Sequence, residues 1–421
     1  MAEKYQTFAK KSTRKFEVLG RKELAMSVPL PLVEVWEDLQ PEVEHLTGIA
    51  GLKIIQAVIE DEVTRRVGPR HHPEAASGNL RWGQQPGYVN FCGQKVHICR
   101  PRVRTREGQE VELESYARMQ HDGRRQRAVR EGIVAGLSTR NYRRAVQSVL
   151  DGYGIDKSSV SREFVHASAA QLKELCERKL GELDVVAILI DGIHFGKQVL
   201  VVALGIESSG KKQVLGVWQG ATENTAVVKD LLEDLVARGL STERRYLFVI
   251  DGAKALRAAI ERVFGDRAEV QRCQLHKRRN VAEHLPKNVQ RDYDRRIRNA
   301  YAMSGYAEAK AELEKIFRQL ERVNPSAARS LEETLTVHRL DVGALLRRSL
   351  STTNPIESCL STVERVARRV KRWHGGDQAL RWTATGLLEA ERKFHKVRGY
   401  REMATLQHKL NPSLTQQIQV A

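Results

Sequence analysis

Two short apolar runs in the middle of the chain each end in an Asp-Gly pair. Val185–Ile190 leads into Asp191, and Tyr246–Ile250 leads into Asp251. Apolar runs of this length, bounded by turn residues, are typical of buried β-strands. Taken alone, each pair has a simple structural explanation, a hairpin turn for the first and a helix cap for the second. Two such pairs that close strands of one block favour a shared site for the two carboxylates.

Further strand and helix patterns surround these two runs. Apolar runs predict two more strands, and amphipathic spacing predicts two helices, at Gln198–Ile206, Gln213–Gln219, Thr225–Arg238 and Ala253–Val263. The resulting order is strand, strand, strand, helix, strand, helix. This is the chain order of a ribonuclease H-like (RNase H-like) fold, so we predict an α/β protein with an RNase H-like core.

Glu357 is a third carboxylate that such a core can recruit. A long and mostly helical stretch separates it from Asp251, and this length predicts an all-helical insertion rather than a loop. A predicted helix carries Glu357 near its start. The alternative explanation for Glu357 is therefore a capping box, with Asn354 as the cap and Pro355 in the first turn.

Three carboxylates on one sheet edge suit Mg²⁺, which prefers hard oxygen ligands. Two such ions, about 3.5–4 Å apart, can clamp the attacking and leaving oxygens in phosphodiester cleavage and transfer. Asp191, Asp251 and Glu357 are therefore the predicted catalytic and metal-binding residues. Mg²⁺ is the expected cofactor, with Mn²⁺ as its alternative.

The charge of the chain indicates an anionic partner. Lys and Arg number 70 against 52 Asp and Glu, which gives a formal charge of +18, as expected of a protein that meets nucleic acid. The apolar runs are far shorter than the roughly 20 residues that cross a bilayer, and the N-terminal residues lack an apolar secretion segment. Five scattered cysteines indicate a reducing compartment. We therefore expect a soluble, cytoplasmic, multidomain protein with double-stranded DNA and no membrane as its partner.

A basic ribbon is predicted in the N-terminal half. Alternation along the run Lys95–Thr105 puts Arg100, Arg102 and Arg104 on one face of an extended chain, followed by a turn at Glu107-Gly108. A solvated edge strand is the alternative, because Pro101 is excluded from central strands. The whole-chain charge favours a ribbon that follows DNA phosphates.

A helix-turn-helix pattern follows. One amphipathic helix begins at Ser138 and ends near Gly152, and a second begins near Ser158. Ser159, Ser161 and Arg162 face outward on the second helix, where a recognition helix would contact base edges. An ordinary αα-hairpin is the alternative.

Two further groups of residues lie near the predicted catalytic carboxylates. A basic segment after the Glu357 helix can hold the DNA backbone and consists of Arg368, Arg369, Lys371, Arg372 and the adjoining Trp373. Trp373 could stack on an unpaired base, but partial burial in the core is its default interpretation. Cys273 and His276 have the spacing of half a zinc site, and without a second pair we predict a structural role for them.

The resulting domain organisation has regions of different texture. We predict an N-terminal helical region (1–67), a linker with a basic β-hairpin (68–130), a helix-turn-helix region (131–180), the first part of the core (181–276), the helical insertion (277–350), the completion of the core with the Glu357 helix (351–400) and a polar tail (401–421).

From roughly residue 130 to residue 396 the sequence resembles the Mutator-type transposases of bacterial insertion sequences. The most specific element is the Cys-x-x-His segment RCQLHKRRNV, which lies between the second Asp and the Glu. The other matching pieces are GLSTRNYRRAV…YGIDKSSVSR (136–162), the strand with Asp191-Gly192, VIDGAKAL (249–256), STTNPIES (351–358) and RW…AL…LLEAE (372–391).

The resemblance implies an Asp-Asp-Glu (DDE) transposase with Asp191, Asp251 and Glu357 as its triad, on an RNase H-like core with a helical insertion. It implies hydrolytic nicking at element ends, followed by attack of the freed 3′-hydroxyl on target DNA. We expect at least a homodimer on DNA, in a bacterial cytoplasm and associated with the nucleoid. The alternatives are a non-catalytic helix-turn-helix regulator, an inactive transposase remnant, or a nuclease on the same core.

Overall fold

The computed structural model describes residues 30–70, 78–91, 94–120, 123–137, 157–220, 224–331 and 335–412. The chain forms two compact units, whose main boundary falls within one helix, between Glu163 and Phe164. In the described part of the chain, no helix combines the length and apolar character needed to cross a bilayer.

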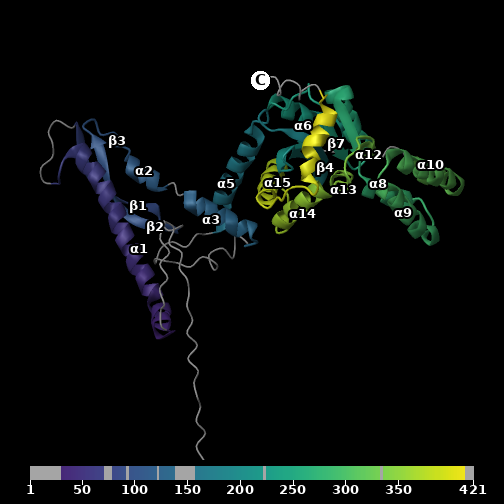
Figure 1. The fold of residues 1–421 in the computed structure, drawn as a ribbon. Helices are drawn as coiled ribbons and strands as arrows, with labels where there is room; N and C mark the ends of the chain where they lie inside the picture. The colour runs from purple at the N-terminus through teal and green to yellow at the C-terminus, as the bar shows by residue number, and fades with distance from the viewer. Residues whose placement is uncertain are drawn as a thin grey trace, which may run out of the picture. The chain divides into compact units, whose positions relative to one another are not determined.

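The N-terminal unit is a long helix against a small antiparallel sheet (Figure 1). Its core joins one face of α1 to the sheet, through residues such as Ile59 and Val63 of the helix and Val89 and Val103 of the strands. The elements are α1 (Leu30–Val67), β1 (Asn79–Phe91), β2 (Gln94–Thr105), β3 (Glu110–Val111), α2 (Glu114–Gln120) and α3 (Gly123–Val134).

The sequence interpretation of this unit was partly wrong. The stretch 68–93 falls in the predicted linker, but half of it is β1, paired along its length with β2. Its polar, Gly- and Pro-containing sequence hides the strand, because an edge strand buries few side chains and tolerates Pro86. The predicted turn at Glu107-Gly108 is confirmed, with Gly108 at a φ of +87°.

The second unit is built around a five-stranded mixed sheet with the order β6-β5-β4-β7-β8. In this sheet β5 is antiparallel to both β4 and β6, whereas β7 is parallel to β4 and to β8. The strands are β4 (Val185–Phe195), β5 (Gln198–Glu207), β6 (Lys212–Gly220), β7 (Tyr246–Ile250) and β8 (Ala268–Arg272). Four of them confirm predicted strands. The edge strand β8 (AEVQR) was missed, because it lacks a continuous apolar run.

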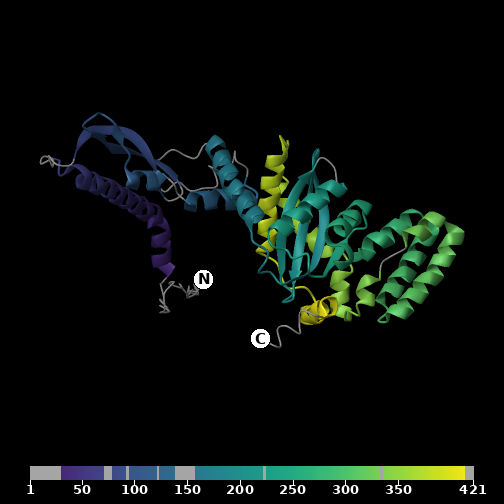
Figure 2. The same cartoon turned by 90° about the horizontal axis from the view of Figure 1, so that it is seen from above.

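Helices cover both faces of this sheet, as Figure 2 shows. Alternate residues of β4 supply the two cores: Leu189 packs with α14 and α15, and Ile190 packs with α6 and α7. The covering helices are α6 (Thr225–Ala237) and α7 (Lys254–Phe264) on one side, and α5 (Lys157–Glu177), α14 (Asn354–Ala367) and α15 (Gly376–Glu391) on the other. The chain is therefore of mixed α/β class, as predicted.

Between β8 and α14, every described element is a helix. This helical region consists of α8 (Gln274–Glu283), α9 (Lys287–Ala302), α10 (Tyr306–Val323), α11 (Pro325–Ser330), α12 (Thr336–Arg339) and α13 (Ala344–Leu350). Helices α8 to α11 have their own apolar core, which includes Tyr293, Ile297 and Leu320, whereas α12 and α13 pack into the core that the sheet shares with α14 and α15. A short 3₁₀ turn (Tyr400–Glu402) and α16 (Met403–Leu410) follow α15.

Candidate active site

Two aspartates occupy equivalent places on neighbouring parallel strands. In the β4–β7 pair, Leu189 lies opposite Val249, and each Asp is two residues further along its strand direction. Neighbouring strands are about 4.8 Å apart, so the parallel register puts Asp191 beside Asp251, at the end of the sheet where β7 finishes. Both are half-buried.

Backbone groups orient both aspartates. An Oδ1 of Asp191 accepts the N–H of Gly192 at 2.9 Å, and Oδ1 of Asp251 accepts the N–H of Ala253 at 2.9 Å. Asp191 is not in a hairpin turn, because β4 continues to Phe195. Asp251 is not the cap of α7 either, since Ala253 has that position.

Glu357 lies in the first turn of α14. The helix is capped at Thr353, not at Asn354 as the capping-box alternative required. The Thr353 hydroxyl donates a short hydrogen bond to Oε1 of Glu357, while the N–H of Glu357 donates to the Thr353 carbonyl at 2.9 Å. About a third of the Glu357 side chain is exposed.

Asp191 and Glu357 both line a cavity of about 360 Å³. His194 and Glu364 also line it, and sequence reasoning passed over both. Glu364 could have been found from its spacing, because residues seven apart share a face of a helix. His194 carries no comparable signal, since only the pairing of β4 in the folded sheet puts it beside α14.

Cys273 and His276 adjoin the same carboxylate. Nδ1 of His276 is 3.8 Å from Oε1 of Glu357, and one ligand atom from each of Cys273, His276 and Glu357 falls within 4.8 Å of the others. The buried thiol of Cys273 accepts the Thr353 N–H at 3.4 Å. A structural zinc site normally has four ligands, whereas this group has three and is the one group of three or more such side chains that the described residues bring this close together. The structural role of Cys273 and His276 stays a prediction.

The environment shifts the pKa of both residues. The hydrogen bond with Cys273 raises the pKa of His276, burial opposes it, and the carboxylates of Glu357 and Asp251 raise it further. Burial raises the pKa of the Cys273 thiol, but hydrogen bonds with His276 and Thr353 outweigh it, so that this pKa is lowered. The charges of Asp251 and Glu357 therefore both contribute to the raised pKa of His276.

The basic segment after α14 lies on the surface next to the end of β4. Arg368, Arg369, Lys371 and Arg372 are exposed. Trp373 is half-buried and packs on Phe195, the last residue of β4, with ring centroids 4.5 Å apart. This position matches its default interpretation as partial core.

The arginine ribbon of β2 is partly neutralised within the N-terminal unit. Arg100, Arg102 and Arg104 all lie within 4 Å of the Glu110 carboxylate, which agrees with their predicted common face. The hydrogen bond from Arg102 is the main cause that lowers the pKa of Glu110 to about 2. Sequence reasoning missed Glu110, because the pairing depends on the β2–β3 turn.

Part of the helix-turn-helix prediction lies outside the described residues, which omit 138–156 and so the whole first helix. The second helix is α5, and it contains Ser159. Ser161 and Arg162 are exposed, as predicted, whereas Val160 and Phe164 are buried.

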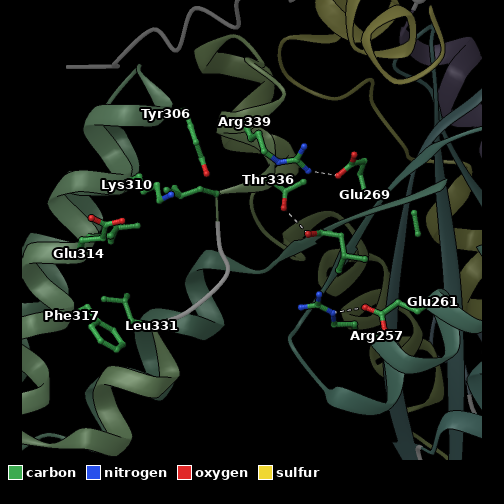
Figure 3. Close-up of a pocket in the computed structure, with 14 residues that line it drawn as sticks. Arg257, Glu261, Glu269, Tyr306, Lys310, Glu314, Phe317, Leu331, Thr336 and Arg339 are labelled. Carbon is green, nitrogen blue, oxygen red and sulfur yellow. Dashed lines mark hydrogen bonds and ion pairs between the residues drawn. The ribbon is translucent and has the colours of Figure 1, made fainter. Parts of the chain in front are cut away.

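A larger cavity, of about 650 Å³, lies between the sheet edge and the helical region (Figure 3). It contains none of the predicted site residues. Its charges are largely paired, through Arg339 with Glu269 and Arg257 with Glu261. The predicted site residues Asp191 and Glu357 line the smaller cavity instead.

The fold and site define a mixed α/β protein in which Asp191 and Glu357 line one cavity. Residues 40–396 match the family model described as Transposase, Mutator family. The transposase for insertion sequence element ISRM5 of Rhizobium meliloti (strain 1021) is 28% identical over 375 residues, 85% of this chain and 90% of that protein. The transposase for IS6120 of Mycolicibacterium smegmatis is 28% identical over 266 residues, 61% of this chain and 80% of its own length. The chain therefore belongs to the Mutator family of transposases, and its function is that of an insertion sequence transposase.

Proposed function

We propose that this transposase cleaves and joins DNA at an RNase H-like core in which Asp191, Asp251 and Glu357 hold Mg²⁺, or Mn²⁺ as the alternative. The parallel pairing of β4 with β7 is the observation that carries the proposal, because it aligns two aspartates at one edge. The sheet order supports the RNase H-like assignment, because β4, β5 and β6 pair antiparallel with one another in chain order and the next two strands, β7 and β8, pair in parallel.

The donor set fits the proposed ion. Asp191, Asp251 and Glu357 offer hard oxygens, and all three are half-buried and so remain accessible to a substrate. When bound, the ions supply Lewis-acid stabilisation of the oxygens that attack and leave phosphorus. The soft Cys273 thiol is engaged by the Thr353 N–H, which supports the proposed separation of structural and catalytic roles.

The protein contributes orientation and charge. The N–H groups of Gly192 and Ala253 hold the two aspartates in place before substrate binds, and such preorganisation avoids reorganisation during the reaction. The exposed arginines at the end of α14 can hold the DNA backbone close to the carboxylates. We further propose that the β2 ribbon and the first turns of α5 contact the element ends.

The proposed reaction has two steps. Water attacks phosphorus at an element end and releases a 3′-hydroxyl. That hydroxyl then attacks a target phosphodiester, so that one P–O bond forms as another breaks. Because two ends must be held together, we propose a homodimer or larger assembly on nucleoid DNA.

The test is metal-dependent nicking and strand transfer on labelled element-end DNA. We expect Asp251→Asn and Glu357→Gln to abolish both activities while end binding persists. Asp230→Asn is the matched control, because Asp230 is an exposed carboxylate on α6, a helix that packs on the opposite face of the sheet from α14, and it should keep full activity.

Other results would redirect or refute the proposal. Equal strand transfer by Asp251→Asn and the unmodified protein would refute the DDE mechanism. Nicking without a joined product would indicate a nuclease. DNA binding with neither activity, at any Mg²⁺ or Mn²⁺ concentration, would indicate a regulator or an inactive remnant.

A further inference from the structure

A single turn between β8 and α8 connects the strand end of Asp251 to the start of the Glu357 helix. The N–H of Cys273 donates to the carbonyl of Ile250, the residue before Asp251, at 2.7 Å. The next N–H, of Gln274, donates to the carbonyl of Ser351 at 2.9 Å. The turn therefore holds two segments that are distant in sequence at a set separation.

Thr353 continues this connection to the carboxylate itself. It is fully buried, and its N–H donates to Sγ of Cys273 at 3.4 Å. Its Oγ1 donates to Oε1 of Glu357 and lies 3.4 Å from Nδ1 of His276. Because a hydroxyl has one proton to donate, the contact with His276 is one in which the ring N–H donates to Oγ1.

These bonds form a chain from His276, through the Thr353 hydroxyl, to Glu357. Glu357 needs such support, because its long side chain is one-third exposed and has several rotamers open to it. A buried threonine has little rotamer freedom of its own. The hydroxyl therefore selects the Glu357 rotamer that faces the cavity shared with Asp191.

We propose that Thr353 is a positioning residue for catalysis, which orients Glu357 through its hydroxyl and is itself held by Cys273 and His276. The proposal rests on the proposed function, in which Glu357 binds the catalytic ion. It also gives the Cys-x-x-His segment a specific role, which is to hold Asp251 and Glu357 at a set distance.

Two substitutions of Thr353 separate positioning from folding. Thr353→Val keeps the shape of the side chain and removes the donor, whereas Thr353→Ser keeps the donor and removes a buried methyl group. We expect Thr353→Val to nick and transfer about 10- to 100-fold more slowly, as an ångström-scale misplacement does, and to need more Mg²⁺ for half-maximal rate. Thr353→Ser should retain a near-normal rate even if its melting temperature is lower.

If Thr353 had only a structural role, activity would follow melting temperature, and Thr353→Ser would be slower than Thr353→Val. A Thr353→Val protein with unchanged rate and Mg²⁺ dependence, beside an inactive Glu357→Gln protein, would overturn this inference alone. An active Glu357→Gln protein would instead overturn the proposed function.

Discussion

The contact between α14 and α15 offers a sharp test of the structure, because it holds the Glu357 helix in place. Gly386 is buried in α15 against Val363 of α14. An alanine Cβ at this position would be 2.7 Å from the Cα and 3.1 Å from the Cγ2 of Val363. Carbon atoms pack at about 3.5–4.0 Å, so Gly386→Ala requires the two helices to separate by about 1 Å.

Two opposing effects determine the size of the change. Alanine favours a helix interior over glycine by about 1 kcal/mol, whereas overpacking a core costs about 1–3 kcal/mol. The clash is with a backbone atom, which has no rotamer to change, so the cost should fall at the upper end. We expect a net loss of about 2 kcal/mol in the free energy of unfolding, or roughly 4–8 °C in melting temperature for a unit of this size.

Activity should fall by more than this loss of stability implies. Glu357 is about 9 Å along α14 from Val363, so a shift of the helix reaches the carboxylate. A misplacement of about 1 Å costs roughly 100-fold in rate. Thermal unfolding and strand transfer below the melting temperature measure the two effects. In the control Gly375→Ala, at the start of α15, the added Cβ would meet no atom within 4 Å, so both values should stay near those of the unmodified protein. A Gly386→Ala protein as stable and active as this control would refute the close packing of the two helices.

Two further predictions concern the N-terminal unit. Glu110→Gln should raise the affinity for duplex DNA several-fold at low salt, because it releases Arg102 and its neighbours from the carboxylate. Arg102→Ala should reduce the slope of log affinity against log salt concentration by about one. Unchanged DNA binding in both variants would exclude β2 from the DNA interface. Glu62 accepts the N–H groups of Glu114 and Ser115 at 2.9 and 2.8 Å; burial raises its pKa, but these bonds, the Ser115 hydroxyl and Arg66 outweigh burial and hold it below the usual 4.5. The stabilisation by Glu62 is therefore present above pH 4.5 and lost as pH falls through the lowered pKa. Glu62→Gln should destabilise the unit by about 2 kcal/mol at pH 7. If the difference in melting temperature between Glu62→Gln and the unmodified protein did not narrow toward pH 3, this role of Glu62 would be contradicted.

Buried strands and amphipathic helices of the second unit were readable from local pattern. A strand covered on both faces must be apolar at every position, so Val185–Ile190 and Tyr246–Ile250 appear as continuous runs with an Asp at the end. The same logic failed for the edge strands β1 and β8. Each has only one fully buried side chain, so neither shows a continuous apolar run.

The carboxylates themselves could be proposed from local sequence, but their surroundings could not. Which residue caps α14, which arginines Glu110 neutralises and which hydroxyl contacts Glu357 all depend on atoms brought together by folding. Thr353 and Cys273 are 80 residues apart and touch only because the Cys273 turn bonds to both Ile250 and Ser351. Periodicity reports how a segment meets the core, whereas hydrogen-bond partners across such distances follow from the packing of whole elements and leave no periodic trace in the chain.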